Sequence, residues 1–328
     1  MKKNVLISAI VGIFIVIFGA YFLNRRDFSI DSMEKIEVTE FENKLPDYKS
    51  SYYIDAYNNN STEQLKENFT ILVKGKDEPI YVDFAQVGST SEVLMKIYFD
   101  FKPIQFKTEG TNFLEEHIFE AQDGMKIKFP VYFGEGVDLN DEKTHKLFIT
   151  FTSIPNEHIL NYNRTTDFYG VNAVYDITKS AGEDYSDNLI QLFNNRIVPK
   201  NNFEESFGTF ILNTDYENEE YELNKGIKIS DLNISAQRES SLPLMYNIDK
   251  LGCDNVLLLL TVGYKVNNEK IVMLDGENGT ANGSIEVTVP EESGLYEVIA
   301  YAIYNPFDHV TGENHLADCS YRFTLSVN

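Results

Sequence analysis

The chain of 328 residues has no tryptophan, only two cysteines and only five histidines. With so few cysteines it cannot be a small secreted scaffold held together by many disulfides. Because carbohydrate-binding sandwiches often stack sugar rings on tryptophan, its absence weakens a lectin hypothesis without excluding it. The fold must therefore rest on a hydrophobic core, and 43% of the residues are hydrophobic.

Signatures of catalysis are also missing. The sequence contains no G-x-S-x-G, H-E-x-x-H, G-x-G-x-x-G, Walker or C-x-x-C pattern. Ser32–Lys35 matches S-x-x-K, but no core surrounds this position to desolvate the lysine, so we treat it as a chance match. We expect no catalytic residues, no cofactor and no enzymatic activity. An envelope hydrolase is the less favoured alternative.

One long apolar run organises the chain. Val5–Leu23 is nineteen residues without a charged side chain, and a helix of that length spans roughly 28 Å, close to the hydrocarbon core of a bilayer. No small-x-small cleavage pattern ends the run, so we expect an uncleaved single-pass transmembrane anchor within residues 1–26, a cleaved signal peptide being the alternative. Basic residues flank both ends, but the strand-rich remainder favours an extracytoplasmic body.

Charge outside the anchor is strongly acidic. The whole chain carries −23, and residues 27–328 hold 24 basic against 51 acidic side chains, a net charge of −27. Such a field repels nucleic acid and anionic lipid headgroups. We therefore expect no nucleic-acid partner and favour a protein partner, a cation or a neutral surface. The favoured interpretation of the charge itself is that it only keeps the body soluble and away from the membrane.

Period-two alternation predicts antiparallel strands, buried on one face, from Phe69 onward. Pro130 cannot donate to a ladder, so we expect strand 125–133 at a sheet edge. Further strands are expected at 69–74, 79–85, 146–152 and 168–177. In strand 93–101 the predicted core face is Val93, Met95, Ile97, Phe99 and Phe101, and the opposite face is Leu94, Lys96, Tyr98 and Asp100.

These strands predict an all-β first domain over residues 67–178, preceded by a stalk at 27–66. Within the stalk, a short strand near 36–38 is an option, and four tyrosines at 48–57 are expected to pack on the first domain or to meet a partner. Residues 179–205 are expected to connect two domains through a short helix capped by Ser186, with Leu189, Ile190, Phe193 and Ile197 at helical spacing.

The second predicted domain, residues 206–328, has the clearest strands. Val256–Leu260 is continuously apolar, as expected of a central strand covered on both faces. In the last strand, Tyr321, Phe323, Leu325 and Val327 alternate with Ser320, Arg322, Thr324 and Ser326. Together the two domains predict tandem β-sandwiches behind the anchor.

A short motif in the second domain resembles a known family. In EESGLYEVIAY, residues 291–301, Gly294, Leu295 and Tyr296 resemble the Gly-x-Tyr turn into strand F of immunoglobulin-like and fibronectin-like sandwiches. The resemblance implies that the Tyr296 hydroxyl bonds back to the backbone at the sheet corner. Val298 stands where antibody domains carry a core cysteine, so the inter-sheet disulfide of those domains is absent here.

The remaining candidates are cysteines and acidic loops. An even number of strand reversals places Cys253 and Cys319 at one end of the sandwich, which permits a disulfide but does not require one, and two thiols are the default. The loop Asp275–Ser284 has oxygen ligands that superficially suit calcium, but it lacks the later bidentate glutamate. His309 and His315 lie near Glu313 and Asp318 without zinc spacing. We expect no metal at either loop.

These features predict a membrane-anchored extracytoplasmic binding or scaffold protein. The alternative is an accessory or sensor subunit of an envelope or transport complex. Bulky replacements at Ser8, Gly12 or Gly19 in the anchor should disturb such a subunit and leave a simple tether unaffected.

Overall fold

The structure, a computed structural model, describes residues 35–41, 51–58, 69–75, 77–158, 170–179, 184–187, 189, 196–197, 201–203, 211–213, 233–249, 253, 255–266, 272–275, 280–310, 317–320 and 322–328. All of its strands lie in one compact unit, Ile36–Asn328. Within the described ranges no helix is long and apolar enough to cross a membrane, and the anchor predicted at 5–23 lies outside them.

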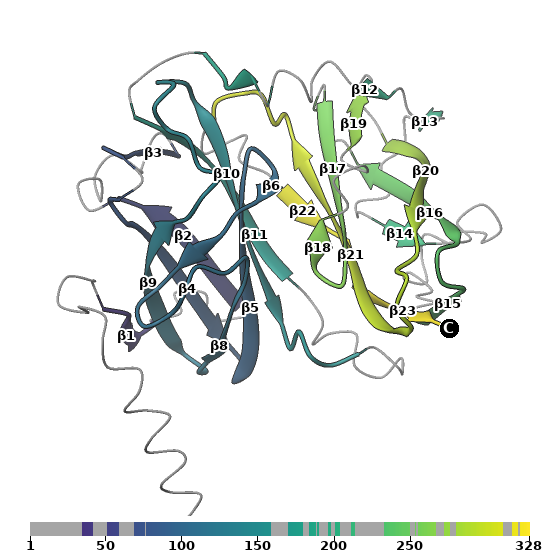
Figure 1. The fold of residues 1–328 in the computed structure, drawn as a ribbon, viewed down its shortest axis with the longest axis horizontal. Coiled ribbons are helices and arrows are strands. Elements are labelled where there is room, and N and C mark those ends of the chain that lie inside the picture. Colours follow the sequence, from purple (N-terminus) through teal and green to yellow (C-terminus); the bar gives the residue numbers. More distant parts are fainter. Residues whose placement is uncertain are drawn as a thin grey trace, which may run out of the picture. The chain divides into compact units, whose positions relative to one another are not determined.

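The named elements of the described residues are all β-strands, in four sheets (Figure 1). The all-β prediction is therefore confirmed. Most neighbouring strands run antiparallel, and the short pairs β3/β11, β12/β19 and β15/β23 run parallel.

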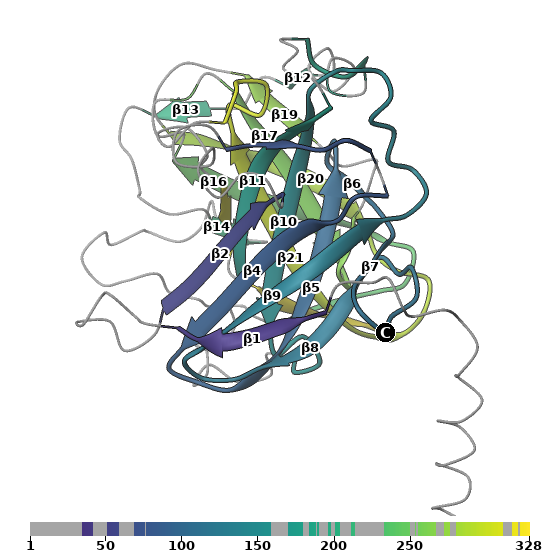
Figure 2. The ribbon, with the colours of Figure 1, turned by 90° about the vertical axis from the view of Figure 1, so that its left-hand side faces the viewer.

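The first sandwich consists of sheets 1 and 2 (Figure 2). Sheet 1 has the order β1-β9-β4-β2, with β7 also paired to β9, and sheet 2 has the order β3-β11-β10-β5-β6, with β8 also paired to β5. The strands of sheet 1 are β1 (Glu37–Glu40), β2 (Ser51–Tyr57), β4 (Ile80–Val87), β7 (Phe106–Lys107) and β9 (Met125–Phe133). Those of sheet 2 are β3 (Thr70–Leu72), β5 (Ser91–Phe99), β6 (Lys102–Pro103), β8 (His117–Ala121), β10 (His145–Ser153) and β11 (Gly170–Thr178).

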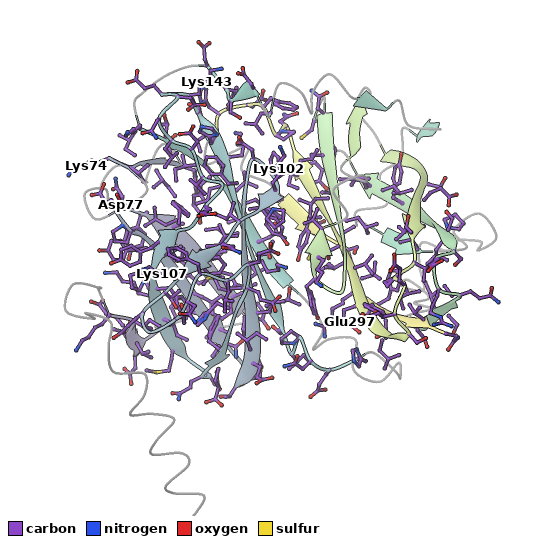
Figure 3. All side chains as sticks on the ribbon, in the orientation of Figure 1. Lys74, Asp77, Lys102, Lys107, Lys143 and Glu297 are labelled. Carbon is purple, nitrogen blue, oxygen red and sulfur yellow. The ribbon has the colours of Figure 1, made fainter. Side chains whose placement is uncertain are left out.

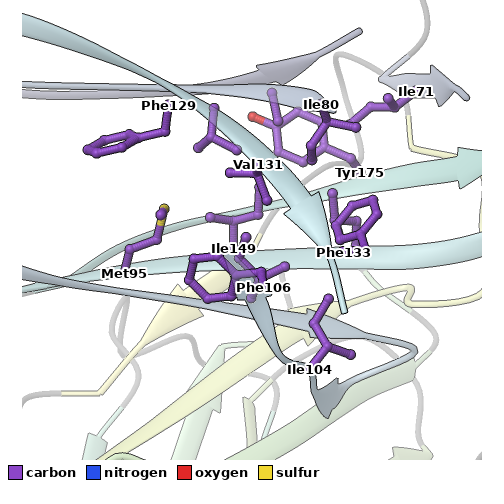
Figure 4. Close-up of a cluster of buried hydrophobic side chains, with 14 of the residues drawn as sticks. Ile71, Ile80, Met95, Ile104, Phe106, Phe129, Val131, Phe133, Ile149 and Tyr175 are labelled. Atoms are coloured by element: carbon purple, nitrogen blue, oxygen red, sulfur yellow. The ribbon is translucent and has the colours of Figure 1, made fainter. Parts of the chain in front are cut away.

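An aromatic-rich core fills the space between sheets 1 and 2 (Figure 4). Phe84 of β4 stacks on Phe151 of β10 with ring centroids 4.4 Å apart, and Phe129 and Ile149 belong to the same cluster. The predicted core face of β5 reaches this cluster from Val93 to Phe99. Phe101 does not, because Asp100 and Phe101 have positive φ angles of 48° and 62° and turn the chain.

The predicted stalk is too long, because two of its segments belong to sheet 1. β1 pairs with β9, and β2 pairs with β4 along its full length. Tyr57 of β2 stacks on Tyr81 with centroids 5.8 Å apart, and Tyr52 packs against the first core. For Tyr52 and Tyr57 the expected packing on the first sandwich is confirmed, and Tyr48 lies outside the described residues.

The second sandwich consists of sheets 3 and 4. Sheet 3 has the order β12-β19-β17-β21-β23-β15, with β18 paired to β17 and β22 to β21, and sheet 4 has the order β13-β20-β16-β14. The strands of sheet 3 are β12 (Arg196–Ile197), β15 (Asn233–Ala236), β17 (Asn255–Val262), β18 (Lys265–Val266), β19 (Val272–Asp275), β21 (Gly294–Tyr304), β22 (Ala317–Cys319) and β23 (Phe323–Val327). Those of sheet 4 are β13 (Asn201–Phe203), β14 (Ile211–Asn213), β16 (Ser241–Asp249) and β20 (Thr280–Thr288).

The core of the second sandwich includes Leu258 and Leu260 of β17, Val298 of β21 and Leu325 of β23. β17 lies between β19 and β21 and is buried on both faces. The expectation of a central strand at 256–260 is therefore confirmed.

Two local expectations need correction. The expected helix begins where predicted, because Asp187 and Leu189 are helical and the Ser186 hydroxyl accepts the Leu189 N–H at 3.4 Å as an N-cap does. Ile197 does not continue it, because Ile197 lies in strand β12, and Ile190 and Phe193 lie outside the described residues. β9 is not an edge strand, because it pairs with β4 on one side and with β1 and β7 on the other. Pro130 is tolerated because β1 reaches only Lys128 and β7 begins opposite Phe133 and Tyr132.

Candidate functional site: the interface between the sandwiches

The motif that resembles immunoglobulin-like sandwiches lies at the start of β21. The Tyr296 hydroxyl donates a hydrogen bond to the Glu292 carbonyl at 2.9 Å, and Val298 is buried in the second core. Gly294 opens the strand, but a Cβ there would only touch the Tyr296 ring at an ordinary 3.5 Å. A different glycine makes room for this ring: at Gly263, with φ of 56°, a Cβ would lie 3.0 Å from Tyr296 Cδ1.

Cys253 and Cys319 do not form a disulfide. Cys253 packs in the second core, whereas Cys319 pairs with Tyr301 and lies on the opposite face of sheet 3. Cys253 precedes β17, whereas Cys319 lies opposite Tyr301, which pairs with Leu259 in the middle of β17, so both the position along the sheet and the face separate the two cysteines. Burial, followed by the nearby Asp318 charge, raises the pKa of the Cys319 thiol to about 12, which makes it a poor nucleophile.

Parts of both acidic loops lie outside the described residues. These parts are residues 276–279 and 311–316, which include His315 and Glu313. Among the described residues, no three His, Cys, Asp or Glu side chains are grouped so that they could hold a metal ion. His309 instead faces the buried carboxylate of Asp176, with its Nδ1 3.1 Å from Oδ2.

The functional groups gather where sheet 2 meets sheet 3. Phe148 of β10 and Tyr301 of β21 contact edge to face, with ring centroids 5.3 Å apart. The cluster around them consists of Tyr98, Phe101, Phe148, Val174, Leu189, Leu257, Leu259, Ile299, Tyr301, Ile303 and Val310. We call this contact the inter-sandwich interface. It joins the two sandwiches through apolar side chains from both.

The interface also buries the faces of strands that the sequence predicts to be exposed. Leu94, Lys96, Tyr98 and Asp100 are each 3% exposed or less, and so is Arg322 in the second sandwich. A polar residue on the outer face of a strand normally reaches water. Here the outer face of one sandwich covers the outer face of the other, so these groups must find partners within the protein.

The first buried charge cluster, the lysine cluster, contains Lys146, Asp176 and the segment 308–310. Lys146 of β10 lies directly opposite Asp176 of β11, and its Nζ is 2.6 Å from Asp176 Oδ1. Nζ also donates to the Asp308 carbonyl at 2.5 Å. Asp176 Oδ2 accepts the Val310 N–H at 3.0 Å. Burial lowers the pKa of Lys146, even though Asp176 opposes this shift.

Next to it, Asp100 bonds to both a serine and a histidine. Ser186 Oγ donates to Asp100 Oδ2 at 2.6 Å, and His145 Nδ1 lies 2.9 Å from the same oxygen. His145 Nε2 lies 3.0 Å from Asp141 Oδ1. In a catalytic triad the histidine bonds to the serine, whereas here the aspartate stands between them. This serine is therefore held in place without an adjacent base to activate it.

The second buried charge cluster, the arginine cluster, contains Arg322 and Glu297 of the second sandwich. Arg322 Nε is 3.1 Å from Glu297 Oε2, with both side chains at most 1% exposed. The guanidinium reaches into the first sandwich and donates to the carbonyls of Ser153 at 3.0 Å and Ile154 at 3.1 Å. It also donates to the Tyr264 hydroxyl at 2.7 Å. Arg322 therefore bonds to residues of both sandwiches.

Glu297 receives further bonds that satisfy its other oxygen. The Thr324 hydroxyl donates to Oε1 at 2.6 Å, and His158 Nδ1 lies 3.0 Å from the same atom. Close to this cluster, Lys96 of the first sandwich donates to the carbonyl of Tyr264, the residue whose hydroxyl bonds to Arg322. Burial lowers the pKa of Lys96. Glu297 of β21, labelled in Figure 3, therefore contacts Thr324, His158 and Arg322.

Sequence reasoning finds the strands that carry these groups but not the site itself. Lys146 and Asp176 are charged residues within β10 and β11, and Arg322 directly precedes β23. The available signal is a charged residue within a strand whose neighbours on the same face are aromatic or aliphatic, such as Phe148 and Val174. That signal does not reveal which partner faces each charge.

Comparisons with known proteins leave the family open. No family model and no curated protein matches the chain. The chain is similar to the CsuC–CsuE chaperone–tip adhesion subunit complex of Acinetobacter baumannii (11% identity, 85% of this chain, 99% of that chain, TM-score 0.23). It is also similar to the C-terminal domain of the antigen I/II-family protein AspA of Streptococcus pyogenes (8% identity, 85% of this chain, 100% of that chain, TM-score 0.23). A third similar structure is a CARDB domain from Pyrococcus furiosus in complex with di-metal ions (13% identity, 39% of this chain, 95% of that chain, TM-score 0.22). Likeness at these TM-scores carries no argument about function.

Proposed function

We propose that the chain is a non-enzymatic, membrane-tethered binding or scaffold protein whose two sandwiches act outside the membrane as one rigid body. The observation that carries the proposal is the inter-sandwich interface. Domains joined by a small polar contact move relative to each other by default. A contact with an apolar cluster and two desolvated charge clusters resists such motion, because separation would expose both.

Rigidity suits a protein that presents a surface at a fixed place. The apolar run Val5–Leu23 supports a tether, and the charge of −27 on residues 27–328 supports a body that stays away from anionic lipid headgroups. The position of Asp100 between Ser186 and His145 supports a non-enzymatic role for that group. Hydrolysis of peptidoglycan or peptides by the purified full-length chain would overturn this part of the proposal.

Topology is tested with the full-length chain carrying a tag at each end. Protease is added to intact cells and, as a control, to lysed cells. We expect the C-terminal tag to be lost from intact cells and the N-terminal tag to remain on a short fragment. A C-terminal tag that survives on intact cells but not in lysate would place the body inside and contradict the proposal.

The partner is sought by proximity labelling from the C-terminus of the full chain in intact cells. Gly12→Leu and Gly19→Leu in the apolar run distinguish a tether from an accessory subunit, because small residues let helices approach closely. A tether keeps its labelled neighbours in these variants. Loss of the neighbours, with surface abundance unchanged, would favour the accessory subunit.

A further inference from the structure

In the lysine cluster, the amine of Lys146 and the carboxyl group of Asp176 are in contact and buried. Lys146 and Asp176 are cross-strand neighbours in β10 and β11, and their side chains are 1% and 0% exposed. Nζ and Oδ1 are 2.6 Å apart, shorter than the roughly 2.7–2.9 Å of a charge-assisted N–H···O bond. The amine therefore lies in direct contact with the carboxyl group, and both are shielded from water.

We propose that Lys146 and Asp176 join in an amide bond, a covalent cross-link between β10 and β11. One proton passes from the Lys146 ammonium group to Asp176 Oδ1, the neutral Nζ attacks Cγ, the new Nζ–Cγ bond forms and the Cγ–Oδ1 bond breaks. Two protons of the ammonium group leave with Oδ1 as one water molecule, and the third stays on the amide nitrogen. No atom changes its oxidation state, so the step needs no oxidant or reductant.

The surroundings favour this step in three ways. Burial lowers the pKa of Lys146, and only the neutral amine is a nucleophile. Asp176 Oδ2, which becomes the amide oxygen, already accepts the Val310 N–H at 3.0 Å and faces His309 Nδ1 at 3.1 Å, as donors in an oxyanion hole do. Two groups held in contact also react as if at roughly 10⁵–10⁸ M.

Desolvation also shifts the equilibrium. An ion pair buried away from water loses the hydration of both charges, whereas an amide is neutral and its oxygen keeps the two donors already present. The water that forms can escape to solvent. The product is therefore favoured here more than it would be for the same two groups in water.

The chain offers an internal comparison. Lys126 Nζ lies 2.5 Å from Asp83 Oδ2, but the Lys126 side chain is 30% exposed. Water keeps that ammonium charged and competes for the carboxylate. We expect the Lys126–Asp83 pair to remain ionic, so proximity alone does not produce the cross-link.

The experiment measures the intact mass of the full-length chain, purified in detergent and denatured. We expect a mass lower than that of the sequence by one water molecule, about 18 Da. Trypsin should fail to cut after Lys146, so that residues 144–164 and 165–179 appear as one branched peptide. An intact mass equal to the sequence mass, or a water loss mapped to Asp-Gly sites instead of Lys146 and Asp176, would overturn the proposal.

Substitutions test whether Lys146 and Asp176 are the residues that react. Lys146→Arg and Asp176→Ala should each restore the sequence mass, because each removes one reacting group. Lys126→Arg is the matched control and should keep the water loss. A water loss that persists in Lys146→Arg would contradict the assignment. If either cross-link variant fails to accumulate, the peptide map of the unchanged protein still decides the question.

Discussion

At the scale of single residues, the inter-sandwich interface is defined by charges without access to water. Arg322 and Glu297 are at most 1% exposed, with Nε and Oε2 3.1 Å apart, and the guanidinium also donates to the Ser153 carbonyl. A buried pair of this kind adds little net stability compared with apolar residues of the same size. Removing one partner, however, leaves the other charge buried and uncompensated.

We predict that Arg322→Met lowers the free energy of unfolding by about 3–5 kcal/mol, because Glu297 loses its cation. Denaturant titration of the full chain measures this. The matched control is Lys128→Met, whose partly exposed pair with Glu37 spans 3.5 Å and should contribute about 0–1 kcal/mol. Equal effects of the two substitutions would show that Arg322 is not held as described.

His145 makes stability depend on pH. Both ring nitrogens face carboxylate oxygens, of Asp100 and Asp141, so both must donate, which requires the charged ring. Burial acts to lower the pKa of His145, but the bonds to the two aspartates outweigh it and the pKa is raised. A raised folded-state pKa adds stability below the unfolded-state value, about 6.5, and this is lost as pH rises through the folded-state value.

Unfolding free energies measured from pH 6 to pH 9 should therefore fall with rising pH in the unchanged protein. His145→Gln keeps a polar side chain but cannot titrate, so its profile should be flatter across this window. A profile of the same slope in the variant would mean that another group is responsible.

At the scale of elements, the sequence predicts strands better than it predicts their surroundings. The period-two pattern gives β9 the bounds Met125–Phe133, the same as the observed strand, and identifies the core face of β5 from Val93 to Phe99. The pattern cannot show what covers the opposite face. Lys96 and Asp100 are predicted to face outward, yet they are buried because a second sandwich packs there.

The same limit applies to short edge strands. β1 and β2 come from the segment predicted as a stalk, and β1 is exposed at every position. Its pairing with β9 depends on backbone hydrogen bonds and on register, which composition does not encode. The charge clusters escape prediction for a related reason, since Lys146 and Asp308 are far apart in sequence.

The turn between β17 and β18 gives a test at this scale. Gly263 has φ of 56° and lies against the Tyr296 ring, where a Cβ would come within 3.0 Å. Gly263→Ala should lower stability by about 1–2 kcal/mol from backbone strain and crowding. Gly124→Ala, with φ of 70° and open space around its Cβ, is the control for strain alone. If the two variants have equal midpoints in thermal unfolding, the contact with Tyr296 adds nothing.

At the scale of the whole molecule, the proposal joins a tether to a rigid acidic body. The apolar cluster around Phe148 and Tyr301 should couple the stabilities of the two sandwiches. Each sandwich has its own core, so either would otherwise be free to unfold first. Coupling through the interface would make the two sandwiches one rigid body, as the proposed function requires.

Calorimetry of the full-length chain tests this coupling most directly. We expect one unfolding transition for Ile36–Asn328, with equal calorimetric and van't Hoff enthalpies, as for a single cooperative unit. Two separate transitions in the unchanged protein, one for each sandwich, would contradict the rigid body and with it the proposed mode of action.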